Sequence, residues 1–515
     1  MTEAADLTLT NAEVHPLTDA ETGEPSAEAV AVRDGEVVRV DSAYEVEFLD
    51  GVETEVVDLD GRTLLPGFID AHTHLAMVGR YQRDADLSGV DSPGTCLDLL
   101  RERRDETAEG WILGFGYDES NWGGEYLIRD RLDSVSTDRP VVAYREDMHL
   151  ASVNSVVLER YGDEMPTEDV RTADGEPTGV LVEDALDVLW DETRPGPEGM
   201  REYLLAAQEH AHSLGITAVH DMVRNSPAPR VYRELDSEGE LSLRVRINYW
   251  RDHLDAVLET GLRTNHGSPR VRTGAIKTFT DGSIGGRTAR LSEPYADVPD
   301  VRGDWVVSPD DYADLAGRVD AAGLQMTTHA IGDEAIGTVL DAYEGTDGER
   351  HRIEHAEVLT DDLIERLAAA DVVVSVQPNF LKWAREGGLY ATRLGEQRRR
   401  ASNRFRALVA AGATLAFGSD CMPLDPLYGI EQTVTAPTAA QRLSVTAALR
   451  AYTSGAAYAG FDEDRLGSVE AGKRADLVVL DESPWAVDPD EIGDIDVATT
   501  VVDGRVVFDA DGQRD

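Results

Sequence analysis

The sequence predicts an α/β protein with a parallel sheet, either a barrel or a doubly wound sheet, and a small β-domain made from both ends of the chain. Three observations predict it. Short apolar segments alternate with amphipathic segments over more than 300 of the 515 residues. Both ends contain alternating apolar residues, which is typical of half-buried strands. In residues 85–200 the strand-like and helical segments are unevenly spaced, and this stretch interrupts the alternation.

The two ends of the chain have the same strand-rich character. Residues 1–65 contain LTLTNAEV, AEAVAVRDGEVVRV and VETEVVDLDGRTLL, in which RDGE and LDGR are typical of hairpin turns. Residues 465–515 contain GSVEAGKRADLVVLD and VATTVVDGRVVF. We expect the two segments to form one composite β-domain. Two unrelated β-extensions are the weaker alternative, because neither segment is long enough to bury its own core.

The body of the chain, residues 66–84 and 201–464, repeats strand and helix. Strand-like segments such as LLPGFIDAH, GAIKTFTD and LQMTTHAI precede amphipathic segments such as SPDDYADLAGRVDAAG, and several of these end in Gly, as helices often do. This repetition predicts parallel strands. In residues 85–200 strands and helices follow at irregular intervals, so we expect an α+β insertion there.

Composition excludes several classes of protein. The chain has 99 acidic and 48 basic residues, a formal net charge of −51, which excludes nucleic-acid binding because phosphate recognition needs concentrated Lys and Arg. Two cysteines are too few for a disulfide framework. We find no signal peptide and no uncharged apolar stretch of about 18 residues, so we expect a cytoplasmic protein without a membrane partner.

The cations are unevenly divided, with three lysines against 45 arginines. An acidic, Lys-poor surface resembles that of halophilic proteins, in which high salt screens the self-repulsion. An ordinary acidic protein from an Arg-rich genome is the alternative. In either case a lysine is unusual here, and its position is informative.

A His-x-His pair ends the strand-like segment LLPGFIDAHTH. Alternate residues of a strand point to the same side, so His72 and His74 are predicted to aim two imidazoles at one point. A second pair, His210 and His212, lies in the helical segment AAQEHAHSLG. Two positions along a helix differ by about 200°, so the second pair cannot share a metal.

Four more polar residues follow apolar strand-like segments. They are Lys277 in GAIKTF, His329 in MTTHAIGD, His355 in RIEHAE and Asp420 in LAFGSD. In a parallel barrel all such strand ends meet on one face, where active sites are built. A single residue of this kind is more often a core or loop residue. Because all of them lie at the ends of strand-like segments, they are predicted to form one shared site.

Lys277 is the most informative of these residues. Burying a lysine in a strand is unfavourable, and elsewhere this chain uses arginine, so a primary amine is predicted to be chemically required. Reaction of the neutral amine with carbon dioxide would give a carbamate whose oxygens can bridge two metal ions. A cationic substrate contact or a Schiff-base lysine is the alternative.

These motifs carry a family resemblance over nearly the whole chain. VVDLDGRTLLPGFIDAHTHL, GATLAFGSD and GSVEAGKRADLVVLD resemble the amidohydrolase superfamily, and KTFTDGSIGGRTA and HAIGD resemble its YtcJ-like branch, amidohydrolase family 3, which includes N-substituted formamide deformylases. The resemblance implies a (β/α)8 TIM barrel, a small β-sandwich from both termini and an α+β insertion that contributes to the pocket.

The resemblance also implies the ligands of a metal centre. His72 and His74 would bind a first metal, and Lys277 as a carbamate would bridge to a second metal held by His329 and His355. Asp420 would bind metal and act as general base toward an activated water. The expected cofactors are one or two divalent ions, zinc or alternatively iron, manganese or nickel, and carbon dioxide as the Lys277 carbamate.

Further residues are predicted to contact a small-molecule substrate, namely His149, Asp281, Arg287, Tyr117 and Trp122. The alternatives are a structural role for His149, and ordering of the loop after the lysine strand for Asp281 and Arg287. The predicted reaction is hydrolysis of a non-peptide C–N bond in a small amide, N-substituted formamide or cyclic amide. The alternatives are a lactone, ester or carbamate hydrolase and a non-catalytic metal-binding regulatory protein. A homodimer is the default expectation for assembly.

Overall fold

The computed structural model describes residues 4–18, 23–107, 110–146 and 150–512. The chain divides into two compact units, Met1–Leu75 with Gln208–Asp515, and Ala76–Ala207. The second unit is longer than the expected insertion 85–200. It includes most of α2 (Leu75–Arg83) and the first part of α7 (Pro197–Ser213), which pack closely, since a Cβ on Gly79 would lie 1.9 Å from the carbonyl oxygen of Tyr203.

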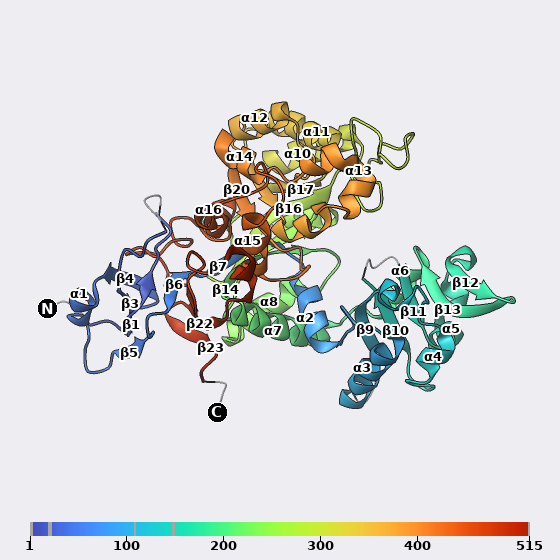
Figure 1. Ribbon diagram of the computed structural model, residues 1–515, viewed down its shortest axis with the longest axis horizontal. Helices are drawn as coiled ribbons and strands as arrows, with labels where there is room; N and C mark the ends of the chain where they lie inside the picture. The colour runs from blue at the N-terminus through green and yellow to red at the C-terminus, as the bar shows by residue number, and fades with distance from the viewer. Residues whose placement is uncertain (1–3, 19–22, 108–109, 147–149, 513–515) are drawn as a thin grey trace. The chain divides into compact units, whose positions relative to one another are not determined.

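The first unit contains a nearly closed parallel barrel (Figure 1). Its eight strands follow the chain order around the sheet and pair only in parallel. They are β7 (Phe68–Thr73), β14 (Ile216–Val223), β15 (Arg244–Trp250), β16 (Val271–Phe279), β17 (Met326–Ala330), β18 (Arg352–His355), β19 (Val373–Val376) and β20 (Thr414–Phe417). The predicted fold class is therefore confirmed, and of the two arrangements the barrel is the correct one.

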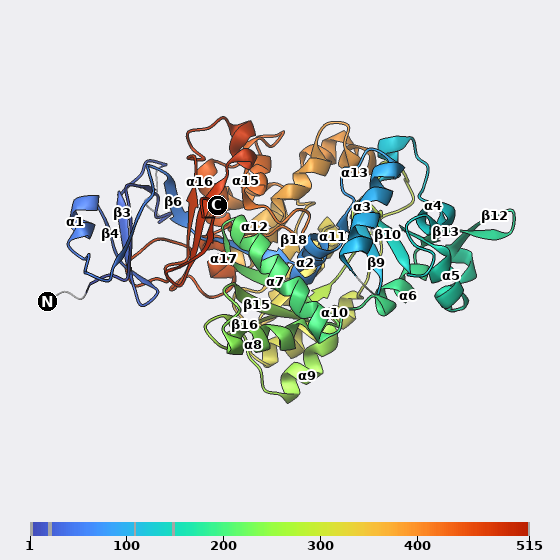
Figure 2. The same ribbon diagram turned by 90° about the horizontal axis from the view of Figure 1, so that it is seen from below.

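Helices follow most strands, as expected for parallel connections. The segment SPDDYADLAGRVDAAG forms α10, capped by Ser308, whose hydroxyl accepts from the N–H of Asp311. Figures 1 and 2 show the helices arranged around the barrel strands. The barrel unit contains α8 (Ala228–Glu238), α9 (Leu254–Glu259), α10 (Pro309–Ala321), α11 (Asp333–Tyr343), α12 (Asp361–Ala369), α13 (Leu389–Arg400), α14 (Phe405–Ala411), α15 (Pro426–Val434), α16 (Val445–Ala451) and α17 (Ser454–Ala459). Among the described residues, no helix combines the length and apolar character that a membrane span requires.

Two glycines allow β7 to take its place in the barrel. The segment LLPGFIDAHT breaks at Gly67, where a Cβ would lie 2.3 Å from a side-chain carbon of Thr217. Beyond β20, a Cβ on Gly418 would lie 2.3 Å from the backbone nitrogen of His72. The N–H of Asp420 donates to the carbonyl of His72 (2.7 Å), so the two edge strands meet at this point.

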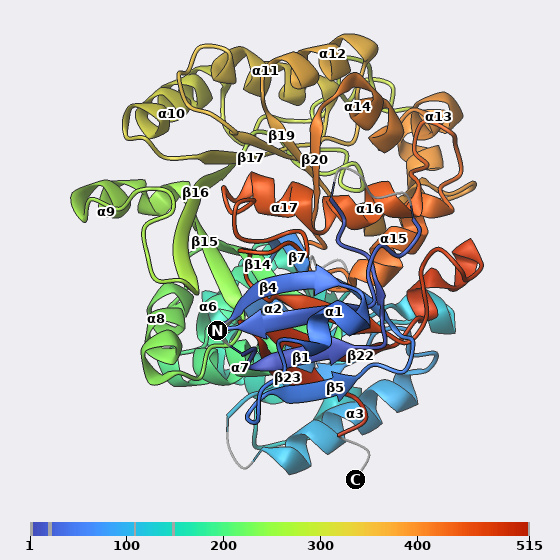
Figure 3. The ribbon, with the colours of Figure 1, turned by 90° about the vertical axis from the view of Figure 1, so that its left-hand side faces the viewer.

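Strands from both termini form two sheets beside the barrel within the first unit. One sheet has the order β4-β3-β1-β5 and the other the order β2-β6-β21-β22-β23. Residues from both sheets, including Leu9, Val30, Leu477 and Val501, share one hydrophobic cluster, and Figure 3 shows the blue strands beside red β22 and β23. The bounds are β1 (Leu7–Thr10), β2 (Glu13–Val14), β3 (Ala29–Arg33), β4 (Glu36–Asp41), β5 (Glu55–Asp58), β6 (Thr63–Pro66), β21 (Leu477–Leu480), β22 (Val497–Val502) and β23 (Arg505–Asp509).

The second unit is built on a mixed sheet of order β12-β13-β11-β10-β9-β8. Both faces of this sheet are buried, because alternate residues of its central strands enter two separate hydrophobic clusters. Its elements are β8 (Ala85–Asp86), α3 (Pro93–Glu106), β9 (Ile112–Tyr117), α4 (Arg129–Asp133), β10 (Val141–Arg145), β11 (Leu150–Val153), α5 (Ser155–Tyr161), β12 (Val170–Ala173), β13 (Glu176–Val182) and α6 (Ala185–Glu192).

The close approach at Gly418 predicts a stability effect. Gly418→Ala is expected to lower the free energy of unfolding by about 1–3 kcal/mol, because the added methyl group overpacks the contact with His72. Urea unfolding measures this. Gly317→Ala is the matched control, because nothing lies within 4 Å of its Cβ position in α10, and it should leave stability equal or raise it by about 0.5–1 kcal/mol. Equal losses for both variants would contradict the packing argument.

Candidate metal centre

The six predicted ligands lie at one end of the barrel. Each is within or just beyond the carboxyl-terminal part of its strand, where parallel barrels carry their functional side chains. They are His72 in β7, His74 directly after it, Lys277 in β16, His329 in β17, His355 at the end of β18 and Asp420 beyond β20.

Two imidazoles converge on one carboxylate oxygen. The Nε2 atoms of His72 and His74 lie 3.6 and 3.2 Å from Oδ1 of Asp420. The Nδ1 of His74 contacts the carbonyl of Met222 (3.2 Å). A carbonyl only accepts, so the hydrogen of His74 lies on Nδ1 and its Nε2 faces Asp420. The geometry agrees with the alternation expected of a His-x-His pair at a strand end.

His355 and His329 continue the cluster. The ring centroids of His72 and His355 are 5.1 Å apart, and those of His329 and His355 are 4.3 Å apart. His72, His355 and Asp420 each offer a ligand atom, and these three atoms lie within 4.8 Å of one another. His329 Nε2 contacts the carbonyl of Gly282 at 3.0 Å.

Lys277 is buried beside these groups. Its side chain is 1% exposed, and its Nζ lies 5.2 Å from the ring centroid of Phe279. Its charge acts on the pKa of all four imidazoles of the cluster. Burial lowers the pKa of Lys277 to about 8, although the carboxylates of Glu354 and Asp420 oppose that change. A substantial fraction of neutral amine is therefore available near pH 8.

Burial decides the charge of three rings. Burial and then the Lys277 charge lower the pKa of His72, and the same two causes lower that of His329 to about 3. Burial and the neighbouring ring of His329 lower the pKa of His355 well below its usual value. All three rings are therefore neutral at pH 7, the state in which imidazole binds metals.

His74 and Asp420 behave as a pair. Burial opposes charge on both. The hydrogen bond that a protonated His74 donates from Nε2 to Asp420, with the attraction between the two charges, prevails, so the pKa of His74 is raised and that of Asp420 is lowered. Asp420 is consequently ionised at neutral pH. A proton on His74 competes with a cation for its Nε2, so acidification should weaken cation binding.

Sequence reasoning missed a buried ion pair that supports His72. Glu354 Oε2 accepts from His72 Nδ1 (2.6 Å), and Glu354 Oε1 accepts from Arg352 Nε (2.9 Å) and from Thr327. Burial opposes ionisation of Glu354, but Arg352 and His72 lower its pKa well below the usual value. The ionised carboxylate fixes the hydrogen of His72 on Nδ1 and leaves Nε2 free toward Asp420. Opposite charges two residues apart in the segment RIEH were the available signal, and all four residues of this strand are buried.

A second missed carboxylate holds the backbone at the site. Buried Asp70 accepts from the N–H of His72 (2.9 Å) and of Ser419 (3.1 and 3.2 Å). Burial raises its pKa to about 7. It joins the two strand ends that carry His72 and Asp420.

Two ligand positions have left-handed backbone, with φ of 72° at His355 and 51° at Asp420. Such conformations are unfavourable for residues other than glycine and concentrate at functional sites. Here the strain turns both side chains at the point where their strands end.

Asp281 and Arg287 both lie in the loop after β16. Asp281 is buried, and its carboxylate accepts backbone N–H groups of Arg290, Ile331 and Gly332 at 2.8–3.1 Å. The geometry favours the loop-ordering role over substrate contact. Arg287 pairs with Asp297 (2.7 Å) and has a φ of 61°; its contact with substrate remains a prediction.

The other predicted substrate residues lie in the second unit. Tyr117 belongs to a hydrophobic cluster, its hydroxyl bonds with Ser152 (2.9 Å), and its ring stacks on Trp122. The indole N–H of Trp122 donates to the carbonyl of Glu125 (2.7 Å). His149 lies outside the described residues. The role of all three in substrate binding remains a prediction.

The donor set fits a divalent cation. Within the described ranges, the buried Nδ1 of His355 and Nζ of Lys277 have no hydrogen-bond partner. Buried polar atoms without partners are costly and are expected to meet a ligand. Imidazoles and a carboxylate without a thiolate suit zinc and other first-row divalent ions.

Comparisons with known proteins show the family to which the chain belongs. A model of the amidohydrolase family matches residues 55–508. YtcJ of Bacillus subtilis is 32% identical, covering 94% of this chain and 96% of its own length. The N-substituted formamide deformylase of Arthrobacter pascens is 27% identical, covering 99% of this chain and all of its own.

A solved structure extends the likeness to the fold. The crystal structure of an uncharacterized metal-dependent hydrolase from Pyrococcus furiosus superposes with a TM-score of 0.80 at 30% identity, covering 94% of this chain and 99% of that chain. The resemblance predicted from the sequence motifs is confirmed. This chain belongs to the amidohydrolase family.

Proposed function

We propose that this protein is a metal-dependent hydrolase that cleaves a non-peptide C–N bond in a small amide, an N-substituted formamide or a cyclic amide. The observation that carries the proposal is the convergence of His72 Nε2, His74 Nε2 and a ligand atom of His355 around the Asp420 carboxylate. The named activity of the Arthrobacter pascens relative, which aligns over 99% of the chain, supports the choice of bond.

The proposed ligand roles follow the arrangement of the strands. His72 and His74 would hold one divalent ion, His329 and His355 would hold a second, and Lys277 as a carbamate would supply oxygen ligands. Zinc is the proposed ion, with iron, manganese or nickel as alternatives. When bound, such ions supply Lewis acidity toward water and a substrate carbonyl.

The protein's own residues handle the proton. Asp420 is ionised at neutral pH because the neighbouring histidines lower its pKa, so it can accept a proton from the attacking water and return it to the leaving amine. Glu354 and Arg352 keep the His72 ring in one tautomer and orientation. Asp70 holds the two strand ends at a fixed separation.

Metal removal tests the proposed function. Dialysis against a chelator is expected to abolish hydrolysis of N-substituted formamides and amides, and zinc should restore it. Asp420→Asn should lower kcat by about 10²- to 10⁴-fold with an unchanged circular dichroism spectrum. Asp255→Asn, at an exposed pair with Arg318, is the control and should keep full activity.

A substrate panel separates the bond types. Amides and lactones with matched side groups are compared by kcat/KM. Faster cleavage of lactones would reject the C–N assignment, and full turnover in a chelator-treated preparation would reject metal dependence.

The Glu354 contact predicts an effect on metal affinity. Glu354→Gln removes the charge that holds the His72 hydrogen and should weaken zinc binding about 10- to 100-fold, measured by competition with a chelating dye. Thr327→Val removes a different hydrogen bond to Glu354 and should bind zinc nearly as tightly as the wild type. Equal affinities in all three proteins would show that the carboxylate does not position His72.

The carbamate can be observed directly. Carbon dioxide reacts with the neutral amine, so the carbamate should increase as pH rises through the Lys277 pKa of about 8. We expect one carbamate signal in ¹³C NMR after exchange with labelled bicarbonate. Lys277→Arg should remove it, and the two other lysines of the chain are internal controls. A signal that persists in Lys277→Arg would contradict the assignment.

A further inference from the structure

A small cavity lies at the opposite end of the barrel from the six predicted ligands. It is lined by residues near the starts of β14, β15 and β16, among them Ala218, Arg244 and Arg272, and by residues that follow α17. The cavity has a volume of about 20 Å³. A water molecule or a small ion fits such a space, whereas drug-sized ligands need several hundred Å³.

Positive charge dominates the cavity lining. Five arginines line it, and Asp462 is the single carboxylate among its lining residues, all of which are described. The arginines are Arg244, Arg246, Arg270, Arg272 and Arg465. This local excess of positive charge contrasts with the net charge of −51 of the whole chain.

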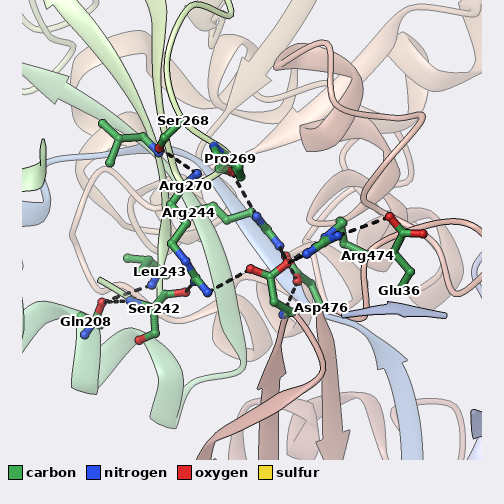
Figure 4. Close-up of polar contacts among 12 residues, drawn as sticks. Glu36, Gln208, Ser242, Leu243, Arg244, Ser268, Pro269, Arg270, Arg474 and Asp476 are labelled. Atoms are coloured by element: carbon green, nitrogen blue, oxygen red, sulfur yellow. Dashed lines mark hydrogen bonds and ion pairs between the residues drawn. The ribbon is translucent and has the colours of Figure 1, made fainter. Parts of the chain in front are cut away.

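Two of the five arginines are neutralised by an adjoining network. Arg244 forms a two-bond contact with Asp476, at 2.5 and 3.0 Å, and Arg270 pairs with Asp503 (2.9 Å). Figure 4 shows Arg244 beside Asp476, and Arg474 reaching Glu36. Arg474 also pairs with Asp503. Three guanidinium groups thus meet three carboxylates, and this network is balanced.

The other three arginines share one carboxylate. Asp462 accepts from Arg246 (2.8 Å), Arg272 (2.8 Å) and Arg465 (3.2 Å). Over the described part of the chain, none of the three forms an ion pair with any other carboxylate. Two positive charges are therefore left without a counter-charge at the cavity, a costly arrangement in a partly desolvated site.

The donors of Arg246 are incompletely used. The residue is 3% exposed, and its Nε and Nη1 have no hydrogen-bond partner among the described residues. Burial, together with the charges of Arg272 and Arg352, lowers its pKa. His220 also lines the cavity, and its Nδ1 accepts from Arg352 (2.8 Å), so in the neutral ring Nε2 carries the hydrogen. The lining therefore offers an excess of donors over acceptors.

We propose that this cavity binds a small inorganic anion, either a halide such as chloride or an oxyanion such as phosphate, held by Arg246, Arg272 and Arg465. The anion would supply the missing acceptor and counter-charge, and guanidinium groups bind both kinds of anion well. It would join the starts of β15 and β16 to the segment after α17. The site is separate from the proposed reaction and stands or falls independently of it.

Thermal unfolding of the full chain tests the site. Midpoints are compared in sodium chloride, sodium phosphate and sodium gluconate at equal ionic strength. Gluconate is the reference, because it is too large for the cavity. We expect a midpoint higher by roughly 2 °C or more in chloride or phosphate, saturating with concentration as ligand binding does. Which of the two saturates identifies the anion.

Variants separate binding from general salt effects. Arg272→Gln and Arg465→Gln change side chains that are 23% and 29% exposed, and both leave Asp462 paired with Arg246. Both variants should therefore fold, and both should lose the rise in unfolding midpoint that saturates with anion concentration. Arg318→Gln, at an exposed arginine in α10, should keep it. An increment that is absent in the wild type, or that persists in both cavity variants, would overturn the proposal.

Crystals of the wild type give a second readout. After exchange into bromide or phosphate, we expect an anomalous bromide peak or phosphate density within hydrogen-bond distance of these guanidinium groups. Crystals in which both anions are absent from the cavity, or in which it holds only water, would reject the site.

Discussion

The arrangement of the site depends on one ion pair inside the barrel, Arg352 with Glu354. Both side chains are completely buried, so each needs the other and a full set of hydrogen bonds to stay charged. Arg352 reaches the carbonyl of Ala71 in β7 (2.6 Å), His220 in β14 (2.8 Å) and Ser375 in β19 (3.0 Å). With the Glu354 contacts to His72 and Thr327, the pair connects five of the eight strands. The imidazole at the end of β7 is therefore held by the same interaction that joins the strands of the barrel.

Much of the candidate site could be predicted because its residue types are conspicuous where they occur. A lysine in a Lys-poor chain and a His-x-His pair at the end of an apolar strand each violate the surrounding pattern. The helical pair could be set aside for the same reason, and in the structure His212 uses both ring nitrogens for contacts with Ile216 and Ser242. The alternation of strand-like and helical segments likewise predicts parallel strands, because the spacing of apolar residues and the turn residues are local properties of the sequence.

The features that the sequence analysis did not predict depend on contacts between segments that are distant in the chain. The alternation alone could not distinguish a barrel from an open sheet. Closure of the barrel depends on the contact of Gly418 with His72, and these residues are more than 300 positions apart in the sequence. Glu354 and Asp70 were missed because a buried carboxylate looks like a surface residue until its partners are known. The second unit extends beyond the expected insertion 85–200 because α2 and α7 pack on one another. Neither segment reveals this contact in its own sequence.

The two ends of the barrel interior are joined by a file of polar groups. His220 lines the arginine-rich cavity and contacts Arg352, which contacts Glu354, which contacts His72 beneath the candidate metal centre. Each step is a hydrogen bond of 2.6–2.9 Å. The interior of the barrel thus contains a continuous hydrogen-bonded path of four side chains, in which Arg352 and Glu354 form the ion pair.

The strand pairing at the termini has a consequence for biosynthesis. β6 lies between β2 and β21, and Thr63 pairs with Leu480 across about 400 residues of chain. At ordinary elongation rates the ribosome needs roughly 20–80 seconds to add those residues. During that interval one edge of β6 has no neighbour, and the hydrophobic side chains that later meet Leu477 and Val501 are uncovered. The sheet around β6 can be completed only after the last strands of the chain have been synthesised.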